Sequence, residues 1–168
     1  IMAEGAWTKE MMDAEVIVCA HYGDCEDLRA LLTDGADSNA VDDGKSTGMH
    51  KAAANGEVAA MKILKEFGAK HLANEGGNLP IHWAAQNGQL KAFQFLIEAY
   101  ECDVLQKNGQ GRSTLTEAFS NGDKDVLEAV LSHPSASEEN LIATQEKGGT
   151  VTLPKEDEED AAASIPEG

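Results

Sequence analysis

The sequence has few aromatic residues, few cysteines and no long apolar run. Aromatic side chains make up only 5% of its 168 residues, so a core would have to be built from small and aliphatic side chains. The three cysteines, Cys19, Cys25 and Cys102, do not make a disulfide framework, which favours a reducing compartment, the cytoplasm or the nucleus. No run of 18 or more apolar residues is present, so no membrane-spanning helix is expected.

The sequence is also poor in basic residues. It has 13 lysines and arginines against 30 acidic residues, which gives a formal net charge of −17. Direct binding to nucleic acid would need a basic stripe, and the sequence has none. Residues 155–168 hold only six of the acids, so the excess charge is not confined to that segment. Such a field would attract a basic partner protein, while simple solubility explains the charge equally well.

What the sequence does contain is a repeated pattern. Three related segments each run into a glycine and then into an apolar pattern with helical spacing: STGMHKAAAN (46–55), LPIHWAAQN (79–87) and STLTEAFSN (113–121). With an earlier glycine the series is Gly23, Gly56, Gly88 and Gly122, at steps of 33, 32 and 34 residues. This period, with two short helices in each unit, predicts a stack of repeats in which neighbours bury each other's apolar faces.

The apolar spacing predicts two helices in each of four units. The expected helices are 13–22 and 25–34, 47–55 and 57–67, 79–87 and 89–100, and 113–121 and 123–132. The expected divisions are an N-terminal extension (1–12), repeats at 13–41, 42–73, 74–106 and 107–134, a short C-terminal helix (135–143) and a disordered acidic tail (144–168). The repeats and the C-terminal helix together form one domain, residues 13–143.

The repeated motif resembles that of ankyrin repeats. LPIHWAAQNG (79–88) is similar to their T-P-L-H-x-A-A-x-x-G core, and GADSNA (35–40) matches their G-A-D-x-N-A exit. The resemblance covers about residues 13–134. It implies an all-α solenoid of about four helix-turn-helix repeats joined by β-hairpin-like loops, and a protein-binding module without enzyme activity. The chain departs from the motif at Thr116, which replaces the histidine, and at Glu101-Cys102, which replaces Gly-Ala.

Two finer resemblances lead to different functions. Residues 81–103, with the later LTEAF and LSHPSASEENLI, are similar to the N-terminal ankyrin part of certain eukaryotic protein methyltransferases. The acidic composition and the EAYECD segment also resemble a small ankyrin chaperone of a basic ribosomal protein. The first implies a targeting domain of a larger methyltransferase, and the second a stand-alone protein that binds a basic partner. Both alternatives stay open at this point.

His50 and His82 are the residues that most invite a catalytic interpretation. In ankyrin repeats the histidine of this motif bridges neighbouring hairpins, so a structural role is favoured. No nucleophile elbow, Walker loop or H-E-x-x-H motif is present. The group Cys19, His21 and Cys25 matches no common zinc spacing. We therefore expect no catalytic residue, no cofactor and no metal.

The resemblance implies a concave binding face made of hairpin tips and the outward positions of each first helix. Trp83, just after the motif histidine, is the favoured anchor because an aromatic side chain buries much area at little entropic cost. Packing between adjacent repeats is the alternative for Trp83, and plain solvation is the alternative for the acids at the tips. The expected partner-binding residues are Trp83, Lys51, Asn55, Asn78, Gln86, Asn87, Arg112, Glu117, Asp42 and Asp43. The expected state is a monomer that binds a basic protein.

Overall fold

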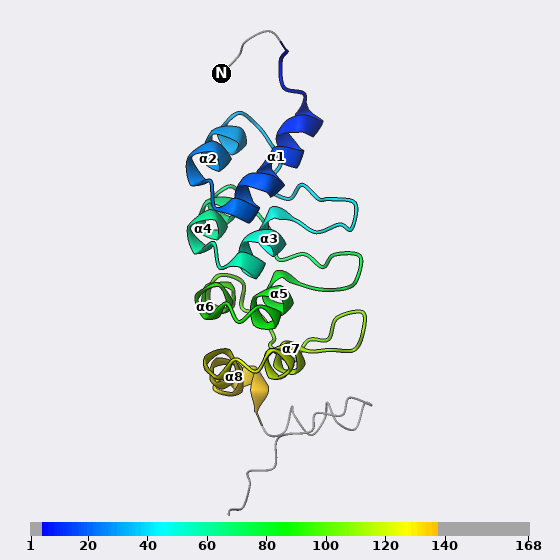
Figure 1. The fold of residues 1–168 in the computed structure, drawn as a ribbon, viewed down its shortest axis with the longest axis vertical. Helices are drawn as coiled ribbons and strands as arrows, with labels where there is room; N and C mark the ends of the chain where they lie inside the picture. Colours follow the sequence, from blue (N-terminus) through cyan, green and yellow to red (C-terminus); the bar gives the residue numbers. More distant parts are fainter. Residues whose placement is uncertain (1–4, 138–168) are drawn as a thin grey trace, which may run out of the picture.

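The structure is a computed structural model that describes residues 5–137. In this range eight α-helices form four pairs: α1 (Lys9–Tyr22) and α2 (Cys25–Thr33), α3 (Gly48–Asn55) and α4 (Val58–Glu66), α5 (Pro80–Gln86) and α6 (Leu90–Tyr100), and α7 (Thr114–Asn121) and α8 (Lys124–Leu131). The pairs stack in chain order, with α1, α3, α5 and α7 in an inner row and α2, α4, α6 and α8 in an outer row (Figure 1). The expected all-α repeat solenoid is confirmed.

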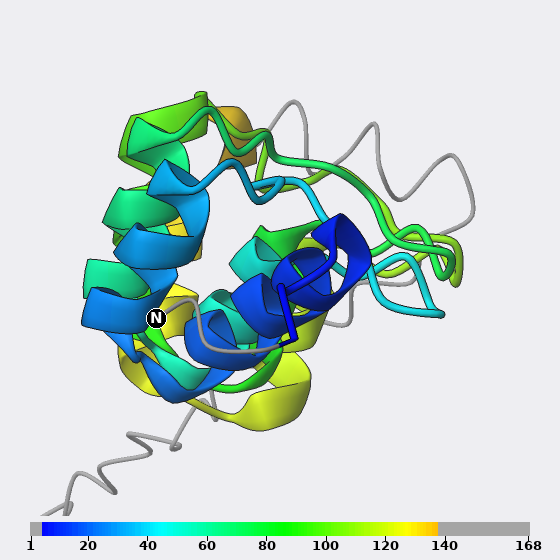
Figure 2. The same cartoon turned by 90° about the horizontal axis from the view of Figure 1, so that it is seen from above.

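Three loops, here called fingers, project from one side of the inner row (Figures 1 and 2). They span residues 41–47, 73–79 and 107–113. In each finger a backbone N–H near the start donates to a carbonyl four residues later: Asp42 to Ser46 (3.0 Å), Asn74 to Asn78 (2.9 Å) and Asn108 to Arg112 (2.9 Å). The first and third also contain an isolated antiparallel β-bridge. The fingers are therefore the β-hairpin-like loops expected from the sequence.

The repeated glycines lie where the inner helices end. Gly23, Gly56 and Gly122 each adopt a left-handed conformation, with φ of 75°, 75° and 74°, which a glycine reaches at little cost. Seven of the eight helices match their expected ranges to within one residue at each end. The exception is α1, which was expected to begin at residue 13. The side chain of Thr8 caps it by accepting the N–H of Met11 at 3.2 Å, so the helix begins at Lys9, inside the expected extension.

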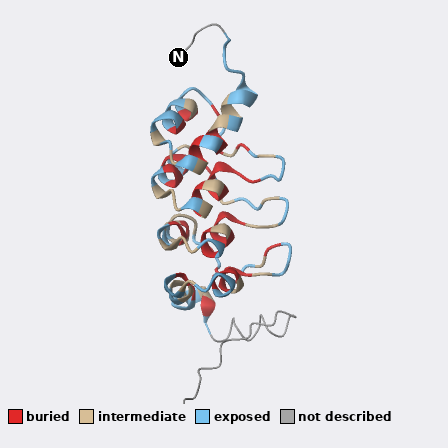
Figure 3. Cartoon of the chain, viewed as in Figure 1, coloured by how far each residue is buried: buried red, intermediate tan, exposed pale blue. Residues whose placement is uncertain are grey.

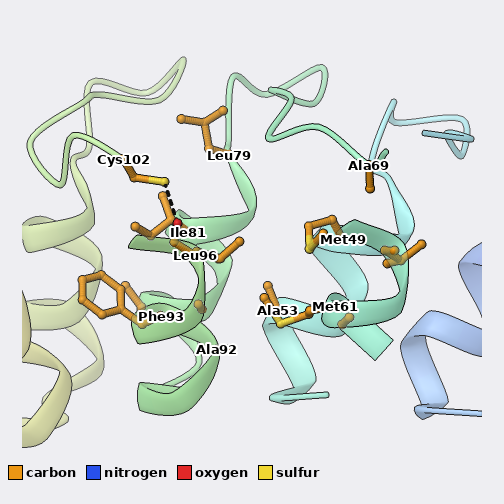
Figure 4. Close-up of a cluster of buried hydrophobic side chains, with 14 of the residues drawn as sticks. Met49, Ala53, Met61, Ala69, Leu79, Ile81, Ala92, Phe93, Leu96 and Cys102 are labelled. Atoms are coloured by element: carbon orange, nitrogen blue, oxygen red, sulfur yellow. Dashed lines mark hydrogen bonds between the residues drawn. The ribbon is translucent and has the colours of Figure 1, made fainter. Parts of the chain in front are cut away.

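The core lies between the two rows. Its largest fully buried side chains include Met49, Met61, Ile81, Phe93 and Leu96 (Figure 4). Between them lie buried alanines in both rows, which let the helices approach closely and explain how a chain poor in aromatic residues is packed. Buried residues gather where the helices face one another and at the bases of the fingers, whereas the finger tips are exposed (Figure 3).

A short 3₁₀-helix, η1 (Pro134–Ala136), follows α8. It covers the start of the short C-terminal helix expected at 135–143, and Ala136 packs into the core. The rest of that helix and the acidic tail expected at 144–168 lie outside the described residues. No helix in the described range is long and apolar enough to cross a membrane.

Candidate functional site

The four inner helices place equivalent residues in one row. Val18, Lys51, Trp83 and Glu117 each lie five residues before the glycine that follows their helix. Because the inner helices stack one after another, these equivalent positions follow one another along the inner row. The fingers and this row together are called the finger face below. It corresponds to the concave binding face expected from the sequence.

Three of the expected residues meet near the middle of the finger face. The Nζ of Lys51 lies 2.9 Å from Oδ2 of Asp42 and 5.2 Å from the centre of the Trp83 ring. That ring also makes a T-shaped contact with His50 of the preceding pair, with ring centres 5.3 Å apart. Trp83 is half-buried, so it packs between repeats and still presents part of its surface.

The carboxylate of Asp42 is held in its ionised form. Burial raises its pKa, but hydrogen bonds from Lys51 and from the backbone N–H of Ser46 outweigh this effect, so the pKa lies below the usual value. The ion pair of Asp42 with Lys51 therefore fixes the base of the first finger to α3. Asp43, at the tip of the same finger, is exposed.

Arg112 and Glu117 form a second ion pair on this face. The Nε of Arg112 lies 2.8 Å from Oε1 of Glu117, and its Nη2 donates to Oε2 of the same carboxylate at 3.1 Å. Nη2 also donates to the hydroxyl of Ser120 at 2.7 Å. Glu117 is only 4% exposed. The structure thus brings these two predicted residues together, and their charges compensate each other.

His50 and His82 connect inner helices to the next finger. The Nδ1 of His50 accepts the N–H of Thr47 at 3.1 Å, so its Nε2 carries the proton and donates to the carbonyl of Asn78 at 2.7 Å. His82 repeats this arrangement with the N–H of Leu79 at 3.0 Å and the carbonyl of Gln106 at 2.8 Å. Burial lowers the pKa of His50 to about 4 and also lowers the pKa of His82. Both rings are neutral, with both nitrogens engaged in the fold.

The three predicted asparagines use their side-chain amides within the fold. Asn55 donates to the carbonyl of His21 (2.7 Å), Asn78 accepts from Asn108 (2.7 Å), and Asn87 donates to the carbonyl of Trp83 (2.8 Å). They join neighbouring repeats or close a helix. Gln86 is exposed one turn after Trp83, on the same side of α5.

Neighbouring fingers are joined by backbone hydrogen bonds at their tips. The N–H of Glu75 donates to the carbonyl of Gly44 at 2.9 Å, which joins the first finger to the second. The N–H of Gly109 donates to the carbonyl of Gly76 at 2.9 Å, which joins the second to the third. The three fingers are therefore ordered relative to one another before any partner arrives.

A groove of about 640 Å³ between α1 and the first finger was not anticipated from the sequence. Val18 and Val41 line it and are 43% and 52% exposed. The spacing to Gly23 would have placed Val18 in the same row as Trp83. The depth of the groove depends on how α1 meets the finger, which no motif in the chain specifies.

The described residues contain no group of three or more His, Cys, Asp or Glu side chains placed to hold a metal ion. The cysteines in this range are free. Burial raises the pKa of Cys19 to about 11 and that of Cys102 to about 12. Both thiols are therefore protonated at neutral pH and serve as small apolar groups in the core.

A family model described as ankyrin repeats in three copies matches residues 16–108, which is more than half of the chain. The matched region runs from α1 to the third finger and contains both bridging histidines. The fourth helix pair lies beyond it and repeats the same arrangement.

Proposed function

The chain belongs to the ankyrin-repeat family, whose repeats are protein–protein interaction modules, and from this premise we propose that it binds a basic partner protein through the finger face without catalysing a reaction. The observation that carries the proposal is the set of backbone hydrogen bonds that orders the three fingers relative to one another, beside the partly exposed Trp83. A surface already ordered in the free protein loses little conformational entropy on binding.

The distribution of charge supports a basic partner. Asp42 of the first finger pairs with Lys51, and in the last repeat Arg112 pairs with Glu117, so the charges within each pair compensate each other. The chain as a whole carries −17. Its field would speed the approach of a basic protein and disfavour acidic competitors, while Trp83 would supply apolar contact area.

A photocrosslinking comparison tests the proposal. A photoreactive phenylalanine analogue would replace Gln86 on the finger face or, as the matched control, Gln94, which is exposed on α6 in the outer row of the same repeat. Each variant would be irradiated in a cell extract at low and high salt, and the adducts identified by mass spectrometry.

We expect adducts with one or a few basic proteins from position 86, lost at high salt, and none of these adducts from position 94. The same adducts at both positions, or adducts at position 86 that are acidic or insensitive to salt, would contradict the proposal. A role as the targeting domain of a larger methyltransferase stays a separate prediction.

A further inference from the structure

The groove between α1 and the first finger differs in character from the rest of the finger face. It lies at the end of the solenoid where the chain begins (Figures 1 and 2). One wall is the side of α1 that carries Asp13 and Val18, and the other is the segment from residue 37 to residue 43. Its volume of about 640 Å³ is large enough for several side chains of a peptide.

The lining of the groove is acidic. Five carboxylates line it, and none of its lining residues is basic: Glu10, Asp13, Asp37, Asp42 and Asp43. Two of the five have cations beside the groove, since Lys9 lies 2.8 Å from Asp13 and Lys51 lies 2.9 Å from Asp42. The other three form no ion pair among the described residues. Among the residues that line the groove, the excess of negative charge therefore rests on Glu10, Asp37 and Asp43.

Two of the apolar residues that line the groove are uncovered. Val18 is 43% exposed and Val41 is 52% exposed. Lys51 and Glu117, at the positions equivalent to Val18, form ion pairs with finger residues, and Trp83 contacts Lys51. Val18 can form no such pair, so its contact with water persists until something covers it, and covering it is favourable by about 25 cal/mol for each Å² buried.

A groove lined by carboxylates and exposed aliphatic side chains is complementary to a particular kind of segment. Arginine and lysine side chains place an apolar stem on an apolar surface while the charged group reaches a carboxylate. An aliphatic side chain between two such residues would cover the valines. Residues 155–168 of this chain carry six acids and one lysine, so their charge is of the wrong sign for this site.

We propose that this groove binds an extended segment of the partner protein in which basic and aliphatic residues alternate, with its cations at the lining carboxylates and its aliphatic side chains on Val18 and Val41. The inference rests on the proposed function and narrows it. Trp83 then contacts a neighbouring part of the partner, while the groove selects the basic segment.

The probe for the test is a fluorescent peptide in which arginine and leucine alternate, hereafter the Arg-Leu peptide, titrated with the full chain. Two further peptides separate the contributions, one with serine in place of leucine and one with glutamate in place of arginine. The apolar test variant is Val18→Ser with Val41→Ser, and the charge variant is Glu10→Gln with Asp43→Asn. Matched controls on α8 are Leu131→Ser and Asp125→Asn, both at exposed positions.

We expect each test variant to weaken binding of the Arg-Leu peptide by about tenfold, and the controls to leave it within about twofold. All four residues changed in the test variants are exposed. Circular dichroism would verify that the variants fold. Amide chemical-shift changes in the unmodified protein should centre on Val18 and Val41.

Several results would overturn the inference. They are failure of the Arg-Leu peptide to bind, equal binding of the serine or glutamate peptide, and shift changes centred on Trp83 and Gln86. The last result leaves the proposed function standing. Conversely, peptide binding at Val18 without specific crosslinks at position 86 would leave the groove intact and contradict binding across the finger face.

Discussion

Lys51 lies over the ring of Trp83, with its Nζ 5.2 Å from the ring centre, while the same ammonium group is paired with Asp42. The free protein thus supplies its own cation to the aromatic surface that a basic partner would use. Trp83 is an imperfect target for mutation because its ring also packs on His50, so truncating it would disturb the contact between repeats. Lys51 is the better target for mutation.

We predict that Lys51→Met tightens binding of the Arg-Leu peptide by about twofold to fivefold, because a competing cation leaves and Asp42 loses its partner. The pKa of Asp42 should rise at the same time, since Lys51 contributes to holding it down. Fluorescence anisotropy measures the first effect and a carboxyl NMR titration the second. Lys91→Met, exposed on α6, is the control, and an affinity equal to that of this control would contradict the prediction.

The contribution of the contact between the second and third fingers to stability can be tested by substituting two glycines of nearly equal conformation. Gly77 has φ of 71° and Gly111 has φ of 75°, so an alanine at either position is strained by about 1–2 kcal/mol. A Cβ at Gly77 would also meet the backbone nitrogen of Gly109, whereas one at Gly111 meets nothing within 4 Å. We expect Gly77→Ala to lower the free energy of unfolding by at least about 2 kcal/mol more than Gly111→Ala. Equal losses in urea titrations would mean that the fingers separate easily.

The third unit has a glutamate at the position where the first two units have a glycine. Glu101 ends α6 with φ of 49°, at the position that Gly35 and Gly68 occupy with φ of 101° and 88°. We predict that Glu101→Gly stabilises the protein by about 0.5–1 kcal/mol, because the strain outweighs the added flexibility of the unfolded chain. Glu98→Gly, exposed within the same helix, should instead destabilise by about 1 kcal/mol. A lower melting temperature for Glu101→Gly would refute the prediction.

The repeated pattern was enough to predict the helices, because a glycine of fixed conformation ends the inner helix and an apolar stripe follows it. The start of α1 was misplaced because its cap, Thr8, lies before the first repeat of the pattern. Thr116 replaces the motif histidine in the last repeat, where the described chain has no further finger for a ring to bridge.

The binding face was harder to predict than the helices. Spacing identified the row that contains Trp83, but it did not reveal which charges compensate each other. Arg112 and Glu117, both expected as binding residues, form an ion pair in which Glu117 is buried. Such pairings depend on distances between a finger and a helix. These distances arise from the packing of whole repeats, and no local motif encodes them.

The buried histidines should make stability depend on pH. Burial holds the pKa of His50 at about 4. It does the same for His71, a partly buried ring whose Nε2 accepts the N–H of Ile81 at 3.3 Å. Because the value in an unfolded chain is about 6.5, the unfolded state binds more protons as pH falls. Their contribution is complete above about pH 6.5 and is lost as pH falls towards 4. We predict a lower free energy of unfolding at about pH 5 than at about pH 7.5 in urea titrations, a range in which ordinary carboxylates stay ionised. His50→Gln, less stable at neutral pH, should show a shallower dependence because one titrating ring is gone. A wild-type stability that is flat across this range, or an unchanged slope in the variant, would show that these rings do not bind protons differently on unfolding.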